Sequence, residues 1–249
     1  MTDKTIVITG ASSGIGAALA RRFAGPGISI VLHARRSKDA LATVAEEVRS
    51  KGATVATMLG DLAEEGTAER VIETCVTAFG GLDVLVANAG FPLMKSFAEG
   101  SASDIDYAFR GNLFSFFALA RAAQPHLNRS ECGRLIAVGS FTAHVFRIDL
   151  PQFPMSAASK GALETAVRSL ALDFAPNGVT VNCVVPGYIE KDRGTSDGMP
   201  RERFAEVNSQ IPVGRLGKPD EVAAMIEFLC GADASYITGQ AVHVNGGLV

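Results

Sequence analysis

The 249-residue sequence lacks the features that mark several specialised classes of protein. Its four cysteines, at positions 75, 132, 183 and 230, show no C-x-x-C spacing, so they predict reduced and mostly buried thiols, with no metal site and no redox pair. Basic residues do not exceed acidic ones, since 23 Lys and Arg stand against 26 Asp and Glu. The net charge of −3 argues against nucleic acid as a partner.

Long apolar segments are absent as well. Residues 1–9 include Asp3 and Lys4 and lack the apolar stretch of a signal peptide. No segment approaches the run of about 18 apolar residues that a membrane helix needs. We therefore expect a cytoplasmic protein with no membrane partner. The chain also contains no internal repeat, low-complexity segment or long linker, which predicts a single domain over residues 1–249.

The composition is that of a folded chain with many turns. Apolar residues make up 47% of the sequence and charged residues 20%, so the chain can bury a sizeable core and lies outside the disordered class. Its 26 glycines exceed the usual share of about 7%, which predicts tight turns and close approaches between backbone segments.

Short apolar runs alternate with longer amphipathic segments, as in βα units around a parallel sheet. Strands are predicted at Ile6–Thr9, Ser29–His33, Thr54–Leu59, Val84–Ala87, Arg134–Val138, Thr180–Val184 and Ala241–Val244. Helices are predicted at Ile15–Phe23, Asp39–Ser50, Glu65–Phe79, Ser103–Leu127, Ser156–Phe174 and Pro219–Cys230. The pattern therefore predicts one doubly wound, Rossmann-like α/β domain with about seven parallel strands and helices on both faces.

The turn after the first predicted strand has the spacing G-x-x-x-G-x-G and leads into a helix. Its candidate binding residues are Gly10, Ser12, Ser13, Gly14, Ile15 and Gly16. Glycines let the backbone approach a pyrophosphate, and the start of the helix offers N–H groups and a positive dipole end. The turn therefore favours a dinucleotide cradle over the alternative of an ordinary glycine turn.

The end of the second predicted strand indicates which dinucleotide is bound. An acidic residue there would bind both ribose hydroxyls and repel a 2′-phosphate, but the sequence has Ala34. The next residues are Arg35 and Arg36, whose guanidinium groups suit a phosphate. This arrangement predicts NADP(H), against the alternative that the two arginines are a solvated pair at the start of a helix.

The glycine turn resembles that of the short-chain dehydrogenase/reductase family, and further segments match the family in order. These are Asp61-Leu62, Asn88-Ala89-Gly90, Asn112, Ser140, Lys160, Pro186-Gly187, Gly239 and Asn245-Gly246-Gly247. The match covers nearly the whole chain and is nearest to the 3-oxoacyl-acyl-carrier-protein reductase-like branch. The resemblance implies a single doubly wound domain, a small-molecule substrate and a homotetramer or homodimer.

The resemblance also implies roles for the matched residues. Gly10, Gly14 and Gly16 would line the pyrophosphate, while Asp61 and Leu62 would meet the adenine. The remaining cofactor-binding candidates are Asn88, Ala89, Gly90, Lys160, Pro186, Gly187 and Ile189. A plain strand-ending turn is the alternative for residues 88–90. The family's usual Thr five residues after Pro186 is Lys191 here, so its contact to the nicotinamide carboxamide is not carried over.

The expected catalytic centre departs from the family. The family's proton donor is a Tyr four residues before the Lys, on the same helix face, but this sequence has Ser156 there. A serine hydroxyl is a far weaker acid than a phenol, whose pKa is about 10, and it has no ring with which to reach a substrate. Asn112 and Ser140 are the other catalytic candidates. By resemblance, Ser140 would polarise a carbonyl and Lys160 would bind the nicotinamide ribose.

Other residues must then supply the proton. Enoyl reductases of this superfamily keep a Tyr seven residues before the Lys, where this sequence has Phe153. A Ser four residues before the Lys resembles 2,4-dienoyl-CoA reductases, whose donor lies on the loop after the fifth strand. In this sequence that loop has no tyrosine but offers Thr142 and His144. An unperturbed histidine side chain titrates near neutrality, so His144 is a candidate acid, and the alternative is a merely exposed loop histidine.

A second donor candidate is Tyr188, which directly follows Gly187, and the alternative for it is a packing role. The irregular segment 187–201 is predicted to be a binding loop. Its charges point to no particular substrate. We expect an NADP(H)-dependent oxidoreductase that reduces a small carbonyl or conjugated enoyl substrate. The alternative is a catalytically weakened relative that binds the dinucleotide as a sensor or scaffold.

Overall fold

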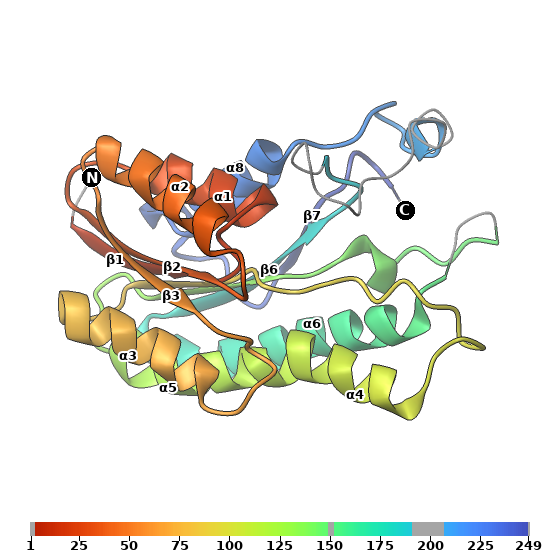
Figure 1. Cartoon of the computed structure of the whole chain (residues 1–249), viewed down its shortest axis with the longest axis horizontal. Helices are drawn as coiled ribbons and strands as arrows, with labels where there is room; N and C mark the ends of the chain where they lie inside the picture. The colour runs from red at the N-terminus through yellow and green to blue at the C-terminus, as the bar shows by residue number, and fades with distance from the viewer. Residues whose placement is uncertain (1–2, 149–151, 191–206, 249) are drawn as a thin grey trace.

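A computed structural model of the chain describes residues 3–148, 152–190 and 207–248. The described residues form one parallel sheet of seven strands in the order β3-β2-β1-β4-β5-β6-β7 (Figure 1). The strands are β1 (Lys4–Ile8), β2 (Ile28–Ala34), β3 (Thr54–Leu59), β4 (Val84–Ala87), β5 (Arg134–Val138), β6 (Thr180–Pro186) and β7 (Ala241–Val244). The strand order reverses between β1 and β4, and parallel sheets of this kind bind ligands at such a switch point.

Helices cover both faces of the sheet. In Figure 1, the face drawn at the top carries α1 (Gly14–Phe23), α2 (Lys38–Ser50) and α8 (Pro219–Leu229). The opposite face carries α3 (Thr67–Phe79), α4 (Ala102–Phe109), α5 (Ser115–Leu127) and α6 (Pro154–Phe174). Successive side chains of a strand point to opposite faces, so Ile6 and Ile8 join the apolar core beneath α1 while Val7 joins the core beneath α3 and α5. The predicted doubly wound sheet is confirmed.

The predicted strand bounds match the structure in four of the seven strands, β3, β4, β5 and β7. The helix predicted at Ser103–Leu127 is divided, because a π-helical segment at Arg110–Phe114 separates α4 from α5. The start of α3 also differs, since Gly66 adopts a left-handed φ of 79° and the helix begins only at Thr67. π-Helical segments inside α-helices are frequent at functional sites, and this one contains Asn112.

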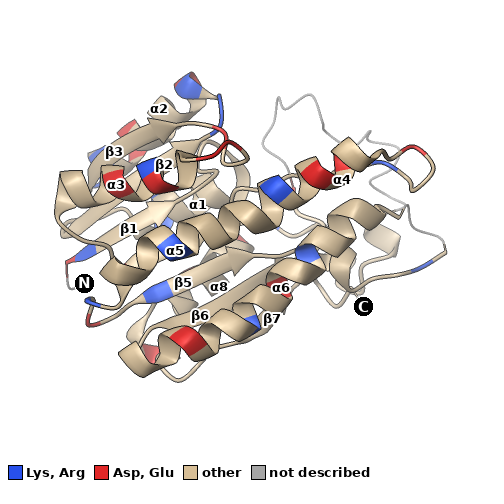
Figure 2. Cartoon of the chain, turned by 90° about the horizontal axis from the view of Figure 1, so that it is seen from below, with Lys and Arg blue, Asp and Glu red and all other residues tan. Residues whose placement is uncertain are grey.

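The described residues include no helix that is both long and apolar enough to cross a membrane. In the view of Figure 2, both acidic and basic residues are seen among the helices α3, α4, α5 and α6. Short 3-10 turns at Phe141–Ala143, Ala175–Asn177 and Ala232–Ala234 were not predicted, because three residues are too few to show a period.

Candidate dinucleotide site and catalytic centre

The glycine loop after β1 adopts a conformation that only glycine permits at several positions. Gly10 and Gly14 have φ values of 66° and 54°, in the left-handed region that other residues avoid. Gly16 lies so close to the preceding turn that an added Cβ would come 2.3 Å from the carbonyl oxygen of Gly10. The helix α1 begins at Gly14, so its N-terminus faces the loop, as a pyrophosphate cradle requires.

Asn88 holds this loop in place. Its side-chain Nδ2 donates to the carbonyl oxygens of Thr9, at 2.8 Å, and Gly10, at 3.1 Å. The hydroxyl of Thr9 in turn accepts from the backbone N–H groups of Asn88, at 3.1 Å, and Ala89, at 3.0 Å. These bonds join the ends of β1 and β4 across the switch point. Asn88 thus shapes the cradle, a role that its position in a strand-ending turn did not predict.

At the expected adenosine end of the site lies Tyr107, a residue that the sequence did not indicate. Arg35 follows β2 directly, and its Nη1 donates to the hydroxyl of Tyr107 in α4 at 2.7 Å. The same Nη1 lies 3.9 Å from Oδ2 of Asp61. Leu62 packs into the core beneath α3 and α5, and Arg36 is exposed. No motif marks Tyr107, because its role depends on a contact between distant segments.

Lys160 occupies a buried position on α6. Its Nζ donates to the carbonyl oxygen of Val138 at 2.7 Å. Burial lowers the pKa of Lys160 to about 8, because the charged form loses its hydration, while Cys183 and Glu164 act in the opposite direction. A lysine with a lowered pKa at the carboxyl ends of the strands is typical of a functional position.

Lys160 and Asn112 meet at Gly90. Asn112 donates from Nδ2 to the hydroxyl of Ser159 at 3.0 Å, whereas its buried Oδ1 has no hydrogen-bond partner among the described residues. A Cβ added to Gly90 would lie 2.9 Å from both Asn112 Oδ1 and Lys160 Nζ. Gly90 therefore lets two polar groups lie directly against its backbone, where any side chain would clash with both. An unsatisfied buried acceptor at such a place is explained by a bound ligand or water.

The two candidate serines have different surroundings. Ser140 lies at the end of β5, and its hydroxyl is 2.9 Å from the hydroxyl of Thr142. Ser156 is buried, and its Oγ accepts from the backbone N–H of Leu93 at 2.6 Å. Ser156 thus joins the segment after β4 to the start of α6. The structure shows this anchoring role at the position where a tyrosine was expected by resemblance.

The two donor candidates from the sequence lie on different segments, His144 after β5 and Tyr188 after β6. His144 Nε2 lies 2.8 Å from Oε1 of Glu164, a buried carboxylate one helical turn beyond Lys160. The ring of His144 also meets the ring of His243 edge to face at 4.4 Å. Burial lowers the pKa of His243, and the neighbouring His144 lowers it further. Glu164 was not predicted, since its partner is 20 residues away in the chain.

Tyr188 packs against the residue that follows Ser140. Its ring centroid lies 4.4 Å from that of Phe141. Pro186 ends β6, and the next residue, Gly187, donates from its N–H to the carbonyl oxygen of Val244 at 3.0 Å. Ile189 forms a β-bridge with Gly217. Lys191 and most of the predicted binding loop lie outside the described residues.

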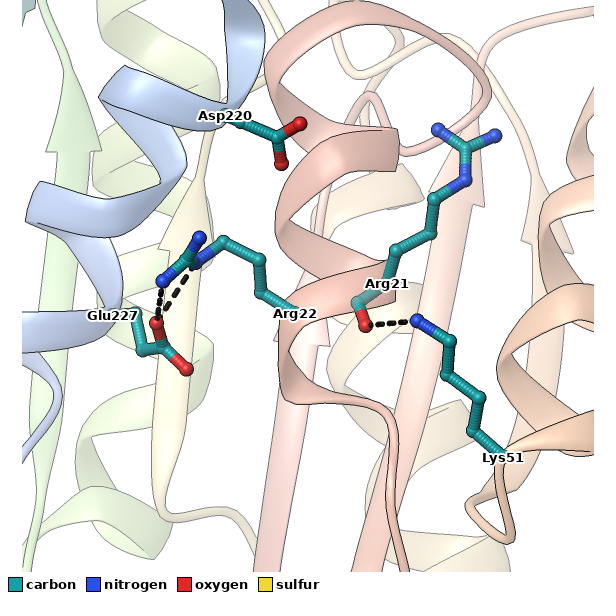
Figure 3. A pocket seen from close by; sticks show the side chains of 5 residues that line it. All are labelled: Arg21, Arg22, Lys51, Asp220 and Glu227. Carbon is teal, nitrogen blue, oxygen red and sulfur yellow. Dashed lines mark hydrogen bonds and ion pairs between the residues drawn. The ribbon is translucent and has the colours of Figure 1, made fainter.

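Two further observations concern other kinds of site. The described residues contain no cluster of His, Cys, Asp or Glu that could hold a metal ion. A hollow of about 450 Å³ between α1 and α8 lies at the end of α1 opposite the glycine loop (Figure 3). In this hollow Arg22 pairs with Glu227, and Lys51 donates to the carbonyl oxygen of Arg21.

The fold and the glycine loop define a dinucleotide-binding α/β protein of the doubly wound class. The sequence matches the profile of the Enoyl-(Acyl carrier protein) reductase family over residues 10–249, and the chain belongs to the short-chain dehydrogenase/reductase family.

Individual members of this family match the chain over nearly their whole length. A 3-oxoacyl-[acyl-carrier-protein] reductase of Aggregatibacter actinomycetemcomitans is 34% identical over 99% of this chain and 99% of its own. The cyclic-di-GMP-binding biofilm dispersal mediator protein of Escherichia coli is 37% identical over 98% of this chain and 97% of its own. A short-chain dehydrogenase from Burkholderia cenocepacia, solved in complex with NADP, has a TM-score of 0.90 at 32% identity, covering 99% of this chain and 98% of its own.

The buried Lys160 makes the stability of the fold depend on pH. Its pKa is about 8 in the folded protein and near the ordinary 10.5 when unfolded, so unfolding takes up a proton between these values. Raising the pH through this window therefore stabilises the folded state, by at most about 1.4 kcal/mol per pH unit. Below about pH 8 both states hold the proton and Lys160 adds no slope.

We expect the free energy of unfolding of the wild type to rise relative to Lys160→Met across this window. Urea denaturation of both proteins at a series of pH values measures the difference. Because every other titrating group is common to both, parallel pH profiles would contradict the assignment.

Proposed function

We propose that this chain is an NADP(H)-dependent oxidoreductase that reduces a small carbonyl or conjugated enoyl substrate. The observation that carries the proposal is that the buried Lys160 and the buried, unpartnered Oδ1 of Asn112 meet at Gly90, at the same edge of the sheet as the glycine loop. Membership of the short-chain dehydrogenase/reductase family supports it. A buried cation and an unpartnered acceptor beside the carboxyl ends of the strands suit the chemistry of hydride acceptance by a carbonyl.

The choice of NADP(H) over NAD(H) has separate support. Position 34 is an alanine, so no carboxylate at the end of β2 competes with a 2′-phosphate. Arg35 and Arg36 follow and supply positive charge. The related short-chain dehydrogenase from Burkholderia cenocepacia is solved with NADP. The residues also fit a dinucleotide, because an added Cβ at Gly14 would meet no protein atom within 4 Å, while Gly10 and Gly16 let the loop pack tightly against Asn88 and its own backbone.

Each polar residue of the centre has a proposed task. Reduced dinucleotide, when bound, supplies the hydride. Lys160, held by the carbonyl oxygen of Val138, binds the nicotinamide ribose and favours negative charge on nearby oxygens. Ser140 donates to the substrate oxygen, with Thr142 orienting its hydroxyl. The unpartnered Oδ1 of Asn112 accepts a hydrogen bond from a water or a substrate hydroxyl.

Three routes compete for the proton that completes the reduction. The first is His144, whose Nε2 lies 2.8 Å from the buried carboxylate of Glu164. The second is Tyr188, beside the turn that follows Ser140. The third is an ordered water relayed through Ser156, whose Oγ accepts from Leu93 and retains its own proton to donate.

We also propose that the protein is a homotetramer or homodimer in the cytoplasm. Large apolar side chains are exposed at Phe114 in the π-helical segment (51%), at Phe117 on α5 (40%) and at Leu172 on α6 (77%). Contiguous exposed apolar groups are typical of interfaces. Association through these segments would cover them.

A second candidate function has one specific observation in its favour. The hydroxyl of Ser156 is engaged by the backbone of Leu93, so the position expected to hold the family's acid serves the architecture. A chain that keeps the dinucleotide cradle without an efficient acid is suited to act as a sensor or scaffold. The similar protein of Escherichia coli is named for binding cyclic-di-GMP.

A turnover screen separates the two functions. We expect NADPH oxidation with at least one member of a panel of ketones, quinones and enoyl thioesters, and loss of that rate in Lys160→Met. Absorbance of NADPH measures the rate, and NADPH binding is titrated in parallel. Binding without turnover on the whole panel would favour the sensor, whereas absence of binding would contradict both.

Replacing Ser156 by Tyr tests the missing acid. We expect ketone reduction to rise by about 10²-fold, the lower part of the range for general acid catalysis, because a phenol regains the place that the family's acid occupies. Ser156→Ala is the matched control, since it also removes the bond to Leu93 but adds no acid. The assignment is wrong if the folded Ser156→Tyr protein binds NADPH and its rate does not exceed that of Ser156→Ala.

Replacing Arg35 by Ala tests the choice of cofactor. We expect the Kd for NADPH to rise about 10- to 100-fold, the loss of one or two charge-assisted hydrogen bonds, with little change for NADH. Arg36→Ala is the control and should have the smaller effect. Titration of both cofactors measures these constants, and equal affinity of the wild type for NADPH and NADH would refute the predicted preference.

A further inference from the structure

Arg35 is held by a residue from a different part of the chain. The guanidinium Nη1 donates to the hydroxyl of Tyr107 at 2.7 Å, although the two residues are 72 positions apart. Arg35 comes from the end of β2 and Tyr107 from the last turns of α4. The contact therefore joins the end of β2, where the 2′-phosphate is expected, to α4.

One side of Tyr107 packs against another ring. Its ring lies 4.5 Å, centroid to centroid, from the ring of Phe91, which follows Gly90 in the segment after β4. Phe91 in turn fills a space left by Gly111, where an added Cβ would come 2.5 Å from the Phe91 ring. The hydroxyl of Tyr107 is thus presented from an aromatic pair, while the residue itself is 37% exposed.

These observations lead to a role for Tyr107. We propose that Tyr107 is a positioning residue that holds the guanidinium of Arg35 toward the 2′-phosphate and so increases the preference for NADPH over NADH. The inference rests on the proposed NADP(H) dependence. Tyr107 itself acts through Arg35 and makes no contact of its own with the phosphate.

The physical reason is the cost of ordering an arginine. Arg35 is about half exposed, and a long side chain at such a place samples many rotamers that must be given up when it binds a phosphate. A neutral hydroxyl that accepts one N–H restricts those rotamers without neutralising the charge. The other N–H groups of the guanidinium stay available to the phosphate oxygens, and preorganisation of this kind raises affinity.

The charged neighbours of Arg35 make the hydroxyl important. Asp61 lies 3.9 Å away and draws the same Nη1 toward the carboxylate. On α4, Asp106 is paired with Arg110 at 2.6 Å and does not compete. The bond to the Tyr107 hydroxyl therefore opposes the attraction of Asp61 and keeps the guanidinium of Arg35 from closing onto that carboxylate.

The test is the substitution Tyr107→Phe, which removes the hydroxyl and keeps the ring pair with Phe91. We expect the Kd for NADPH to rise about 3- to 10-fold, a fraction of the effect of a charge-assisted hydrogen bond, and the Kd for NADH to stay unchanged. Titration by NADPH fluorescence is well suited to this chain, because it contains no tryptophan. Tyr236→Phe is the matched control, since Tyr236 is fully exposed.

A double-variant comparison shows whether Tyr107 acts through Arg35. Tyr107→Phe should have no further effect in a chain that already carries Arg35→Ala. A further loss there would mean that Tyr107 binds the phosphate directly and would overturn the positioning role. Tighter NADPH binding by Tyr107→Phe would show that the contact with Arg35 opposes the cofactor, which would overturn it as well.

The outcome also separates this inference from the proposed function. If Arg35→Ala removes a measurable NADPH preference but Tyr107→Phe leaves it intact, only the role of Tyr107 fails. If the wild type binds NADPH no better than NADH, both the cofactor assignment and the role of Tyr107 fail.

Discussion

The side-chain amide of Asn88 is the contact on which the rest of the site depends. Its bonds to the carbonyl oxygens of Thr9 and Gly10, with the reciprocal bonds to the Thr9 hydroxyl, tie the end of β4 to the glycine loop after β1. Carbonyl groups in a left-handed turn have no partner in a strand ladder, so an amide from the neighbouring strand satisfies them. With the loop fixed in this way, α1 begins directly at the cradle.

The proposed catalytic centre lies around the buried Lys160 on α6. Lys160 loses hydration on burial, and the carbonyl oxygen of Val138 compensates only in part. The hydroxyl of Ser156, four residues earlier on the helix, accepts from the backbone N–H of Leu93. This bond ties the segment after β4 to α6, and one turn beyond Lys160 on the same helix the carboxylate of Glu164 contacts His144.

Two glycines allow close contacts that give the cleft its polar and aromatic walls. Gly90 lets Asn112 and Lys160 lie against its backbone, and Gly111 admits the ring of Phe91. The same short segment after β4 therefore borders both the catalytic centre and the aromatic pair that presents Tyr107 to Arg35. A change in this segment would affect the choice of cofactor and the chemistry together.

The sequence by itself determined the parallel sheet, its strand bounds to within a few residues and the glycine loop. These features depend on local periodicity and on conformations that only glycine adopts, so neighbouring residues suffice to predict them. Only the tertiary structure decided that Asn88 braces the loop, that Ser156 anchors Leu93 and that Tyr107 holds Arg35. These contacts join residues 63 to 79 positions apart, and a hydrogen bond between such distant residues leaves no local pattern in the sequence.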